Sequence, residues 1–236
     1  MKSIILLISI LLLNNLYSQE KFDVEVAEAD YLFSNKEYKN AIIEYDKVIK
    51  GNDKESYNYY LRGLSKYNLE DNMGAIKDFT KAYLLIKNDA LNGNWIYGPR
   101  TFKFNDTYMN AELGLSPVHK FFHLFLYRGH SKYKLEDYRG AILDLKEYIK
   151  YDNTDDDFPG IHKLIGDCYF MLQQYPEAIK FYTEAINLNP ADKSAYFSRG
   201  VSFLNNDALE SACIDLSKSG ELGNEKAYEL ITEYCR

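Results

Sequence analysis

A pair of small residues twelve positions apart recurs along the chain and constrains its fold more than any other feature. A large residue follows the second member of each pair after four positions. The pairs with their large residues are Ala29/Ala41 with Tyr45, Gly63/Ala75 with Phe79, Gly129/Ala141 with Leu145, Gly166/Ala178 with Tyr182, and Gly200/Ala212 with Leu216. Small side chains let helices approach closely, and self-similarity at a fixed period indicates stacked helix pairs. We call the first member of each pair the notch residue, and the two helices the first and second helix of the repeat.

The segment Gly166–Pro190, GDCYFMLQQYPEAIKFYTEAINLNP, carries the fullest version of this pattern. Pro176 stands where a first-turn proline costs nothing, and Pro190 closes the unit. The segment resembles the tetratricopeptide repeat, a helix-turn-helix unit of about 34 residues. The resemblance covers most of residues 22–226 and implies an all-α fold, an α-solenoid of five tetratricopeptide repeats with a C-terminal capping helix. The family's usual alanine is replaced at Val48, Tyr148 and Ser219, and its closing proline occurs only once.

Five segments are predicted along the chain. They are a signal peptide (1–18), repeats one and two (22–89), an aromatic-rich insertion (90–116), repeats three to five (117–226) and the capping helix (227–236). The insertion is inferred because Gly63 and Gly129 are separated by almost two periods. It holds Trp95, the only tryptophan, with several tyrosines and phenylalanines among Gly, Pro and Asn residues, which predicts a loop or a short hairpin. These aromatic residues either pack back on the repeats or form part of a binding surface.

The first residues have the pattern of a secretory signal peptide. Lys2 precedes the apolar run Ile4–Leu13, and small or polar residues lead to Ser18. Because the apolar run is about half of the roughly 20 residues that a spanning helix needs, we predict cleavage after Ser18, no integral membrane segment after cleavage, and an exported protein, periplasmic or extracellular. A net charge of −7 with a pI near 5.2 argues against nucleic acid and anionic membrane surfaces as partners.

The family resemblance implies that the first helices line a concave groove that binds a protein or peptide partner. The positions carried over from the family are Val26, Asp30, Phe33, Tyr57, Tyr60, Leu64, Tyr67, His123, Leu126, His130, Tyr133, Lys163, Asp167, Phe170, Phe197, Val201 and Leu204. Tyrosine offers a large contact area and a hydroxyl at small entropy cost, which suits an extended peptide. The lysine and asparagine with which some family members hold an acidic peptide terminus are absent.

The predicted function is therefore a non-catalytic protein-interaction scaffold of the cell envelope, without a cofactor. The alternative is a carbohydrate or small-ligand binding protein in which Trp95 and the tyrosines stack on sugar rings. A third hypothesis is a hydrolase accessory protein with a metal at the histidines of residues 119–130. No nucleophile elbow, phosphate loop or paired metal motif occurs in the sequence, so no enzyme is predicted.

The candidate metal ligands have a structural interpretation that we favour. His119, His123 and His130 share one helix face, but no cysteine or carboxylate converges on them in the sequence. The acidic loop Asp152–Asp157 lacks the glycine and the bidentate glutamate of a calcium loop and is interpreted as a solvated loop. His162 is predicted to pack in the core.

Arginines precede three of the notch residues. Arg62, Arg128 and Arg199 are predicted to lie beside the helix contact and to pair with carboxylates of neighbouring repeats, because the guanidinium fork matches a carboxylate.

The cysteines are assigned by compartment and by resemblance. The ending ACIDLSKSGELGNEKAYELITEYC resembles the closing segment of many exported bacterial tetratricopeptide proteins, and Cys213 and Cys235 are predicted to form a disulfide that fastens the cap. The alternative is two reduced, buried cysteines. Cys168 is predicted to be an inert core thiol.

Overall fold

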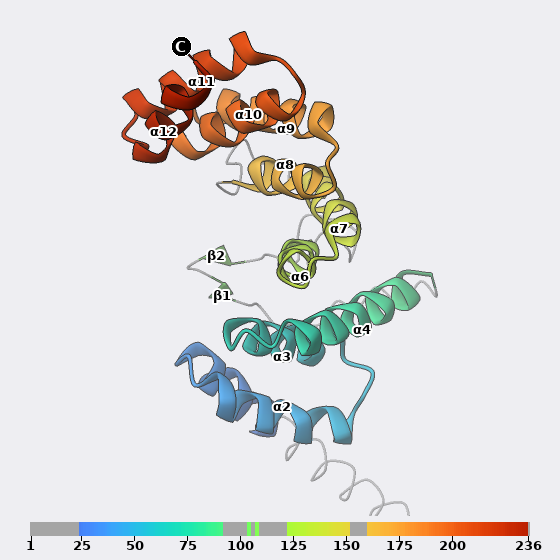
Figure 1. The fold of residues 1–236 in the computed structure, drawn as a ribbon. Coiled ribbons are helices and arrows are strands. Elements are labelled where there is room, and N and C mark those ends of the chain that lie inside the picture. Colours follow the sequence, from blue (N-terminus) through green and yellow to red (C-terminus); the bar gives the residue numbers. More distant parts are fainter. Residues whose placement is uncertain (1–23, 92–102, 105–106, 109–121, 152–159, 236) are drawn as a thin grey trace, which may run out of the picture. The chain divides into compact units, whose positions relative to one another are not determined.

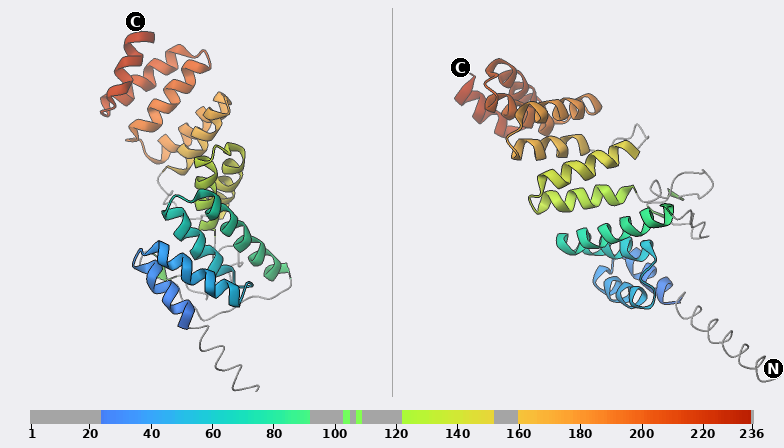
Figure 2. Two further views of the ribbon diagram at one scale, coloured as in Figure 1. Left: turned by 60° about the horizontal axis from the view of Figure 1, so that its bottom comes forward. Right: turned by 90° about the vertical axis from the view of Figure 1, so that its right-hand side faces the viewer.

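The computed structural model describes residues 24–91, 103–104, 107–108, 122–151 and 160–235, which form antiparallel pairs of helices and one small hairpin (Figures 1 and 2). The chain divides into two compact units, residues 1–131 and residues 132–236, which are described separately.

Unit 1 contains the first two repeats and the beginning of the third. Its elements are a helix over residues 24–34, α2 (Tyr38–Gly51), α3 (Ser56–Asn68), α4 (Asn72–Leu91), β1 (Lys103–Phe104), β2 (Thr107–Tyr108) and all but the last turn of α6 (His123–Lys134). The strands pair antiparallel, with Lys103 opposite Tyr108 and Phe104 opposite Thr107. The insertion therefore contains a short hairpin, one of its two predicted forms.

Unit 2 contains the remaining repeats and the capping helix. Its helices are α7 (Tyr138–Tyr151), α8 (Ile161–Met171), α9 (Tyr175–Leu188), α10 (Lys193–Asn205), α11 (Leu209–Glu221) and α12 (Glu225–Tyr234). Figure 1 shows α8 to α12 following one another in sequence order within this unit. The predicted cap corresponds to α12, which begins at Glu225, slightly before the predicted boundary at 227.

The notch residues are the points where first and second helices touch. All the alanines of the pairs are fully buried, and so are the large residues that follow them. A Cβ atom added to Gly166 would lie 2.6 Å from Cε1 of Tyr182, and one added to Gly63 would lie 2.9 Å from Cε1 of Phe79. In repeats two, four and five the large side chain thus occupies the space that the notch glycine leaves open. The predicted all-α fold of helix-turn-helix repeats is confirmed.

The turn between the two helices of each repeat has the same backbone form. Its middle residue, seven positions after the notch residue, has a positive φ although it is never glycine. These residues are Lys36, Glu70, Glu136, Gln173 and Asp207, with φ between 55° and 63°. In repeat four, Gln173 N donates to Phe170 O at 2.8 Å and Gln174 N donates to Tyr169 O at 2.9 Å. Such bonds satisfy the last carbonyls of the first helix and reverse the chain.

Candidate partner-binding surface

The predicted binding residues lie on the first helices at three and four residue intervals, which place them on one helix face. Val26, Tyr60, Leu64 and Leu126 are 3%, 8%, 2% and 6% exposed, so they support this face more than they present surface on it. The remaining predicted residues of the first helices are half-buried. They are Asp30, Phe33, Tyr57, Tyr67, His123, His130, Tyr133, Lys163, Asp167, Phe170, Phe197, Val201 and Leu204. The accessible part of the predicted site consists of this second group.

In unit 1 the face carries an aromatic cluster, which we define as Tyr60, Tyr67, Phe79, Tyr127 and His130. The Tyr67 hydroxyl lies 3.0 Å from Nδ1 of His130, and its ring meets that of Tyr127 edge-on at 5.1 Å. Phe79 stacks on Tyr127 at 6.3 Å and contacts Tyr60 at 6.1 Å. The cluster therefore joins α3, α4 and α6 through aromatic contacts.

Burial keeps the hydroxyls of this cluster protonated. It raises the pKa of Tyr127 to about 12 and raises the pKa of Tyr60 and of Tyr67 above the ordinary tyrosine value. These side chains are consequently neutral hydrogen-bonding groups around neutral pH. Tyr127 was not among the predicted residues, although its position three residues before His130 places it on a neighbouring strip of α6.

In unit 2 the predicted pair Lys163 and Asp167 is engaged within the chain. Lys163 Nζ lies 2.8 Å from Oδ2 of Asp167, and the Tyr182 hydroxyl donates to Oδ1 of Asp167 at 2.9 Å. Burial and the neighbouring carboxylate raise the pKa of Tyr182. The carboxylate therefore links α8 to α9 and has little charge left for a ligand.

Repeat one has the same bond, which we call the Tyr–Asp lock. The Tyr45 hydroxyl donates to Oδ1 of Asp30 at 2.8 Å, again from the second helix to the residue after the notch. Where the large residue has no hydroxyl, the residue after the notch is not acidic. In repeat two the large residue is Phe79 and Leu64 follows the notch residue. In repeat five the large residue is Leu216 and Val201 follows the notch residue. The acidic residues at this position are thus explained by packing within the repeat.

Arginine supplies the polar link in repeats two and five, which lack this lock. Arg62 donates through Nε and Nη2 to both carboxylate oxygens of Asp78, at 2.8 and 2.6 Å, and through Nη1 to Asp46 at 2.6 Å. Arg199 forms the same fork with Asp215, at 2.6 and 2.8 Å. The prediction of neighbouring repeats as partners was correct only in part. The fork binds a carboxylate of the same repeat, and only the remaining N–H group of the guanidinium bonds a residue of the preceding repeat.

The partner of this single N–H group is not always a carboxylate. Arg62 finds Asp46, but Arg128 and Arg199 reach hydroxyls, Thr80 at 3.4 Å and Thr183 at 2.9 Å. The spacing of sixteen residues between arginine and carboxylate in the fork could have revealed the partner in the sequence.

The histidines differ from one another in their surroundings. His130 contacts Tyr67, and His123 lies 4.0 Å, ring centre to ring centre, from Phe122. His162, predicted in the core, is instead 17% exposed, lies 3.9 Å from Glu184 and stacks on Phe181. Within the described ranges, no three His, Cys, Asp or Glu side chains are grouped so that they could hold a metal ion.

Three predictions fall outside the described residues. They concern His119, the loop Asp152–Asp157 and Trp95 with most of the insertion. The alternative of carbohydrate binding through Trp95 therefore stays a prediction.

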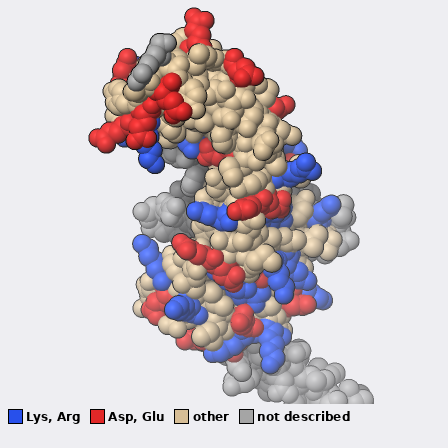
Figure 3. All heavy atoms as spheres, in the orientation of Figure 1, with Lys and Arg blue, Asp and Glu red and all other residues tan. Residues whose placement is uncertain are grey.

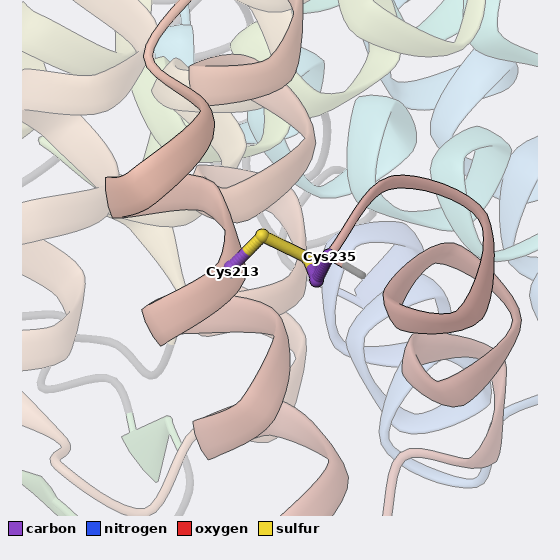
Figure 4. Close-up of a disulfide and its surroundings, with 2 residues drawn as sticks. All are labelled: Cys213 and Cys235. Carbon is purple, nitrogen blue, oxygen red and sulfur yellow. A yellow bond between two sulfur atoms is a disulfide. The ribbon is translucent and has the colours of Figure 1, made fainter.

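The structure joins Cys213 of α11 to Cys235 at the end of α12 in a disulfide, with Cα atoms 5.6 Å apart (Figure 4). Cys168 is a free thiol, fully buried, and burial raises its pKa to about 12. A thiol that stays protonated is a poor nucleophile, in keeping with a packing role.

A family profile described as TPR repeat matches residues 166–207, which include the notch residues Gly166 and Gly200. Residues 166–207 are therefore tetratricopeptide-repeat sequence, and the helix pairs that the structure describes have the fold of such repeats. Hsp70-Hsp90 organizing protein 1 of Arabidopsis thaliana is 55% identical over 38 residues, which are 16% of this chain and 7% of that protein. Hsp70-Hsp90 organizing protein 3 of the same plant is 42% identical over 57 residues, or 24% of this chain and 10% of that protein. The chain matches a tenth or less of the length of these relatives.

Solved structures of tetratricopeptide-repeat proteins share the fold over most of the chain. YrrB, described as a TPR protein with an unusual peptide-binding site, has a TM-score of 0.67 and 18% identity, over 89% of this chain and 90% of that one. MamA from Desulfovibrio magneticus RS-1 has a TM-score of 0.63 and 16% identity, over 86% and 95%. At such identities the likeness concerns the fold alone. Among the helices that the structure describes, none is long and apolar enough to cross a bilayer.

Proposed function

We propose that this tetratricopeptide-repeat protein is a non-catalytic scaffold of the cell envelope that binds a partner peptide or protein on the face of its first helices. The half-buried aromatic residues of unit 1 carry this proposal. Tyr57, Tyr67 and His130 combine apolar ring surface with polar atoms, and the Tyr67 hydroxyl is hydrogen-bonded to His130. Side chains of this kind contribute most of the energy at protein interfaces, because they bury large areas at little entropy cost.

The aromatic contacts also preorganise this surface. Because Tyr67 is held by His130 and Tyr127, its ring does not have to be ordered when a partner arrives. A peptide that binds such a face therefore loses less free energy to side-chain ordering than it would on a face of free side chains.

Two features support a location in the envelope. The signal-peptide pattern that ends at Ser18 predicts export, and the Cys213–Cys235 disulfide is of the kind that persists in oxidising compartments. Mass spectrometry of the chain purified from its own cells tests this part. We expect the envelope or secreted fraction to contain a chain that begins at Gln19. A chain that keeps Met1 and stays with the cytoplasmic fraction would contradict it.

Binding is tested by affinity purification of partners with the mature chain as bait. Tyr57→Ala/His130→Ala removes two accessible side chains of the proposed surface. Tyr31→Ala/Met73→Ala is the matched control, because these side chains are 66% and 71% exposed and lie outside the proposed surface. We expect the first variant to lose partners that the control keeps, with equal helix content by circular dichroism. Retention of every partner by the first variant would show that the face does not bind them.

A further inference from the structure

The capping helix α12 occupies the place of the first helix of a further, incomplete repeat. Ala227 is fully buried, as is Ala195 two residues after the start of α10. The next residue packs alike in both helices. Tyr196 lies against the buried cluster between α9 and α10, and the ring of Tyr228 lies so close to Gly220 of α11 that an added Cβ would be 3.0 Å from Cζ. Helix α12 therefore packs on α11 as α10 packs on α9.

Hydrogen bonds tie the start of α12 to the start of α10. Lys193 Nζ donates to Gly223 O at 3.0 Å, across the turn that precedes α12. Ser219 Oγ donates to Lys193 O at 2.7 Å and accepts from Asn224 Nδ2 at 2.9 Å. Both helices thus begin beside the end of α11. At the other end, the disulfide to α11 holds the last residues of α12.

This register assigns two carboxylates to the binding face. When the two buried alanines are aligned, Glu229 takes the position of Phe197 and Glu233 that of Val201. Both glutamates are exposed, and in the described part of the chain neither forms an ion pair with a lysine or arginine. Figure 3 shows Asp and Glu side chains gathered over the end of unit 2 that α11 and α12 form in Figure 1. Arg236 lies outside the described residues.

The neighbouring helix α10 contributes an apolar strip. Phe197, Val201 and Leu204 follow one another at four and three residues along this helix and are half-buried. On α8, Lys163 and Asp167 neutralise each other. Within the described residues, the face of unit 2 therefore combines an apolar strip on α10 with two glutamates on its α12 side that no lysine or arginine neutralises.

We propose that the α10–α12 face binds an extended peptide segment in which a lysine or arginine lies close to a large apolar side chain. The apolar side chain is removed from water against α10, and the cation meets Glu229 and Glu233. An acidic segment is rejected because its carboxylates would lie against these glutamates. This inference rests on the proposed function and specifies the chemistry of the partner at the C-terminal end of the chain.

Selection from a phage-displayed random-peptide library on the immobilised mature chain tests the proposal. We expect the enriched peptides to contain Lys or Arg within two positions of a large apolar residue. Fluorescence anisotropy then measures the Kd of an enriched peptide. For Glu229→Gln/Glu233→Gln we expect a Kd about 3- to 10-fold higher at low salt, with the difference shrinking at high salt. The matched control is Glu177→Gln/Glu210→Gln, which removes the same charge from exposed positions on α9 and α11 and should leave the Kd unchanged.

The outcomes separate the two proposals. Enriched peptides without basic residues, or equal losses in both variants, would overturn the charge preference and leave the proposed function standing. Selection of no peptide by the mature chain would overturn both. A disulfide-intact chain is used throughout, because the bond holds α12.

Discussion

Replacing Gly166 by alanine tests whether close helix contact at the notch residues determines the fold. The added Cβ would lie 2.6 Å from Cε1 and 2.7 Å from Cδ1 of Tyr182, distances that real Cβ atoms do not reach. The ring cannot simply swing away, because Tyr182 is 1% exposed and its hydroxyl is bound to Asp167. The substitution must therefore displace the second helix, or the ring together with its lock.

The size of the effect follows from three contributions. Overpacking of a core costs about 1–3 kcal/mol. Complete loss of a hydrogen bond to a charged acceptor costs about 1.5–3 kcal/mol, and weakening the bond costs less. Alanine regains about 1 kcal/mol over glycine in a helix. We expect the free energy of unfolding to fall by about 2 kcal/mol, because the ring shifts without losing the bond entirely.

Urea unfolding followed by circular dichroism measures this change, and hydrogen exchange in α8 and α9 shows where it acts, because repeat arrays open locally. Gly200→Ala is the matched control. Its Cβ would lie 3.0 Å from Cγ of Leu216, which is also fully buried but is further away and has no hydroxyl bond to lose, so we expect a smaller loss, of about 1 kcal/mol. In the Gly166→Ala background, Tyr182→Leu should cost less than it does in the wild type. The packing argument would be refuted if Gly166→Ala lost no more stability than Gly200→Ala.

Four further substitutions or conditions give separate tests. Asn58 is 1% exposed, and its amide atoms have no hydrogen-bond partner among the described residues. Asn58→Leu should therefore raise the urea midpoint by an amount equivalent to about 1–2 kcal/mol, and a loss would show that the amide is satisfied. Gln173→Gly should stabilise the turn at φ 58° by about 0.5–1 kcal/mol in the same assay, whereas a loss would argue against strain there. Cys235→Ser should lower stability by about 3 kcal/mol and speed hydrogen exchange in α12, and unchanged exchange would contradict a fastening role. Burial raises the pKa of Cys168 from 9.0 to about 12, so the free energy of unfolding should fall as the pH rises above 9, where the unfolded chain loses this proton and the folded chain keeps it. Alkylation of Cys168 at pH 8 should be much slower in the folded chain than in urea, and equal rates would refute the burial.

The repeated packing could be predicted from the sequence because its cause is local and periodic. A notch residue followed by an alanine and a large residue describes one steric contact, and the chain repeats that contact with little variation. Gly63 with Phe79 and Gly200 with Leu216 are each separated by sixteen residues, like Gly166 with its tyrosine. A feature that returns at constant spacing needs no knowledge of the rest of the structure.

The site was less predictable because its residues serve two purposes. Asp30 and Asp167 occupy positions that the family uses for ligands, yet each accepts a hydrogen bond from a tyrosine fifteen residues later. That spacing exceeds any single-helix period, so only a comparison of the repeats with one another reveals it. The role of α12 was missed for a related reason. Its turn, which contains Gly223 at φ 88°, is shorter than the turn into α10 and shifts the helix out of the periodic register.

The Tyr–Asp lock and the arginine fork also affect where a partner can bind. A first helix has one face toward the binding side, and the residue after the notch lies on it. In repeat four this position is Asp167, which the Tyr–Asp lock engages. In repeat five the fork of Arg199 and Asp215 uses the residue before the notch, which points toward the second helix and the preceding repeat. Val201 therefore takes no part in such a bond, so the apolar strip of α10 stays available for the partner that we propose. Repeats linked by an arginine fork can thus provide binding surface without losing their internal polar link.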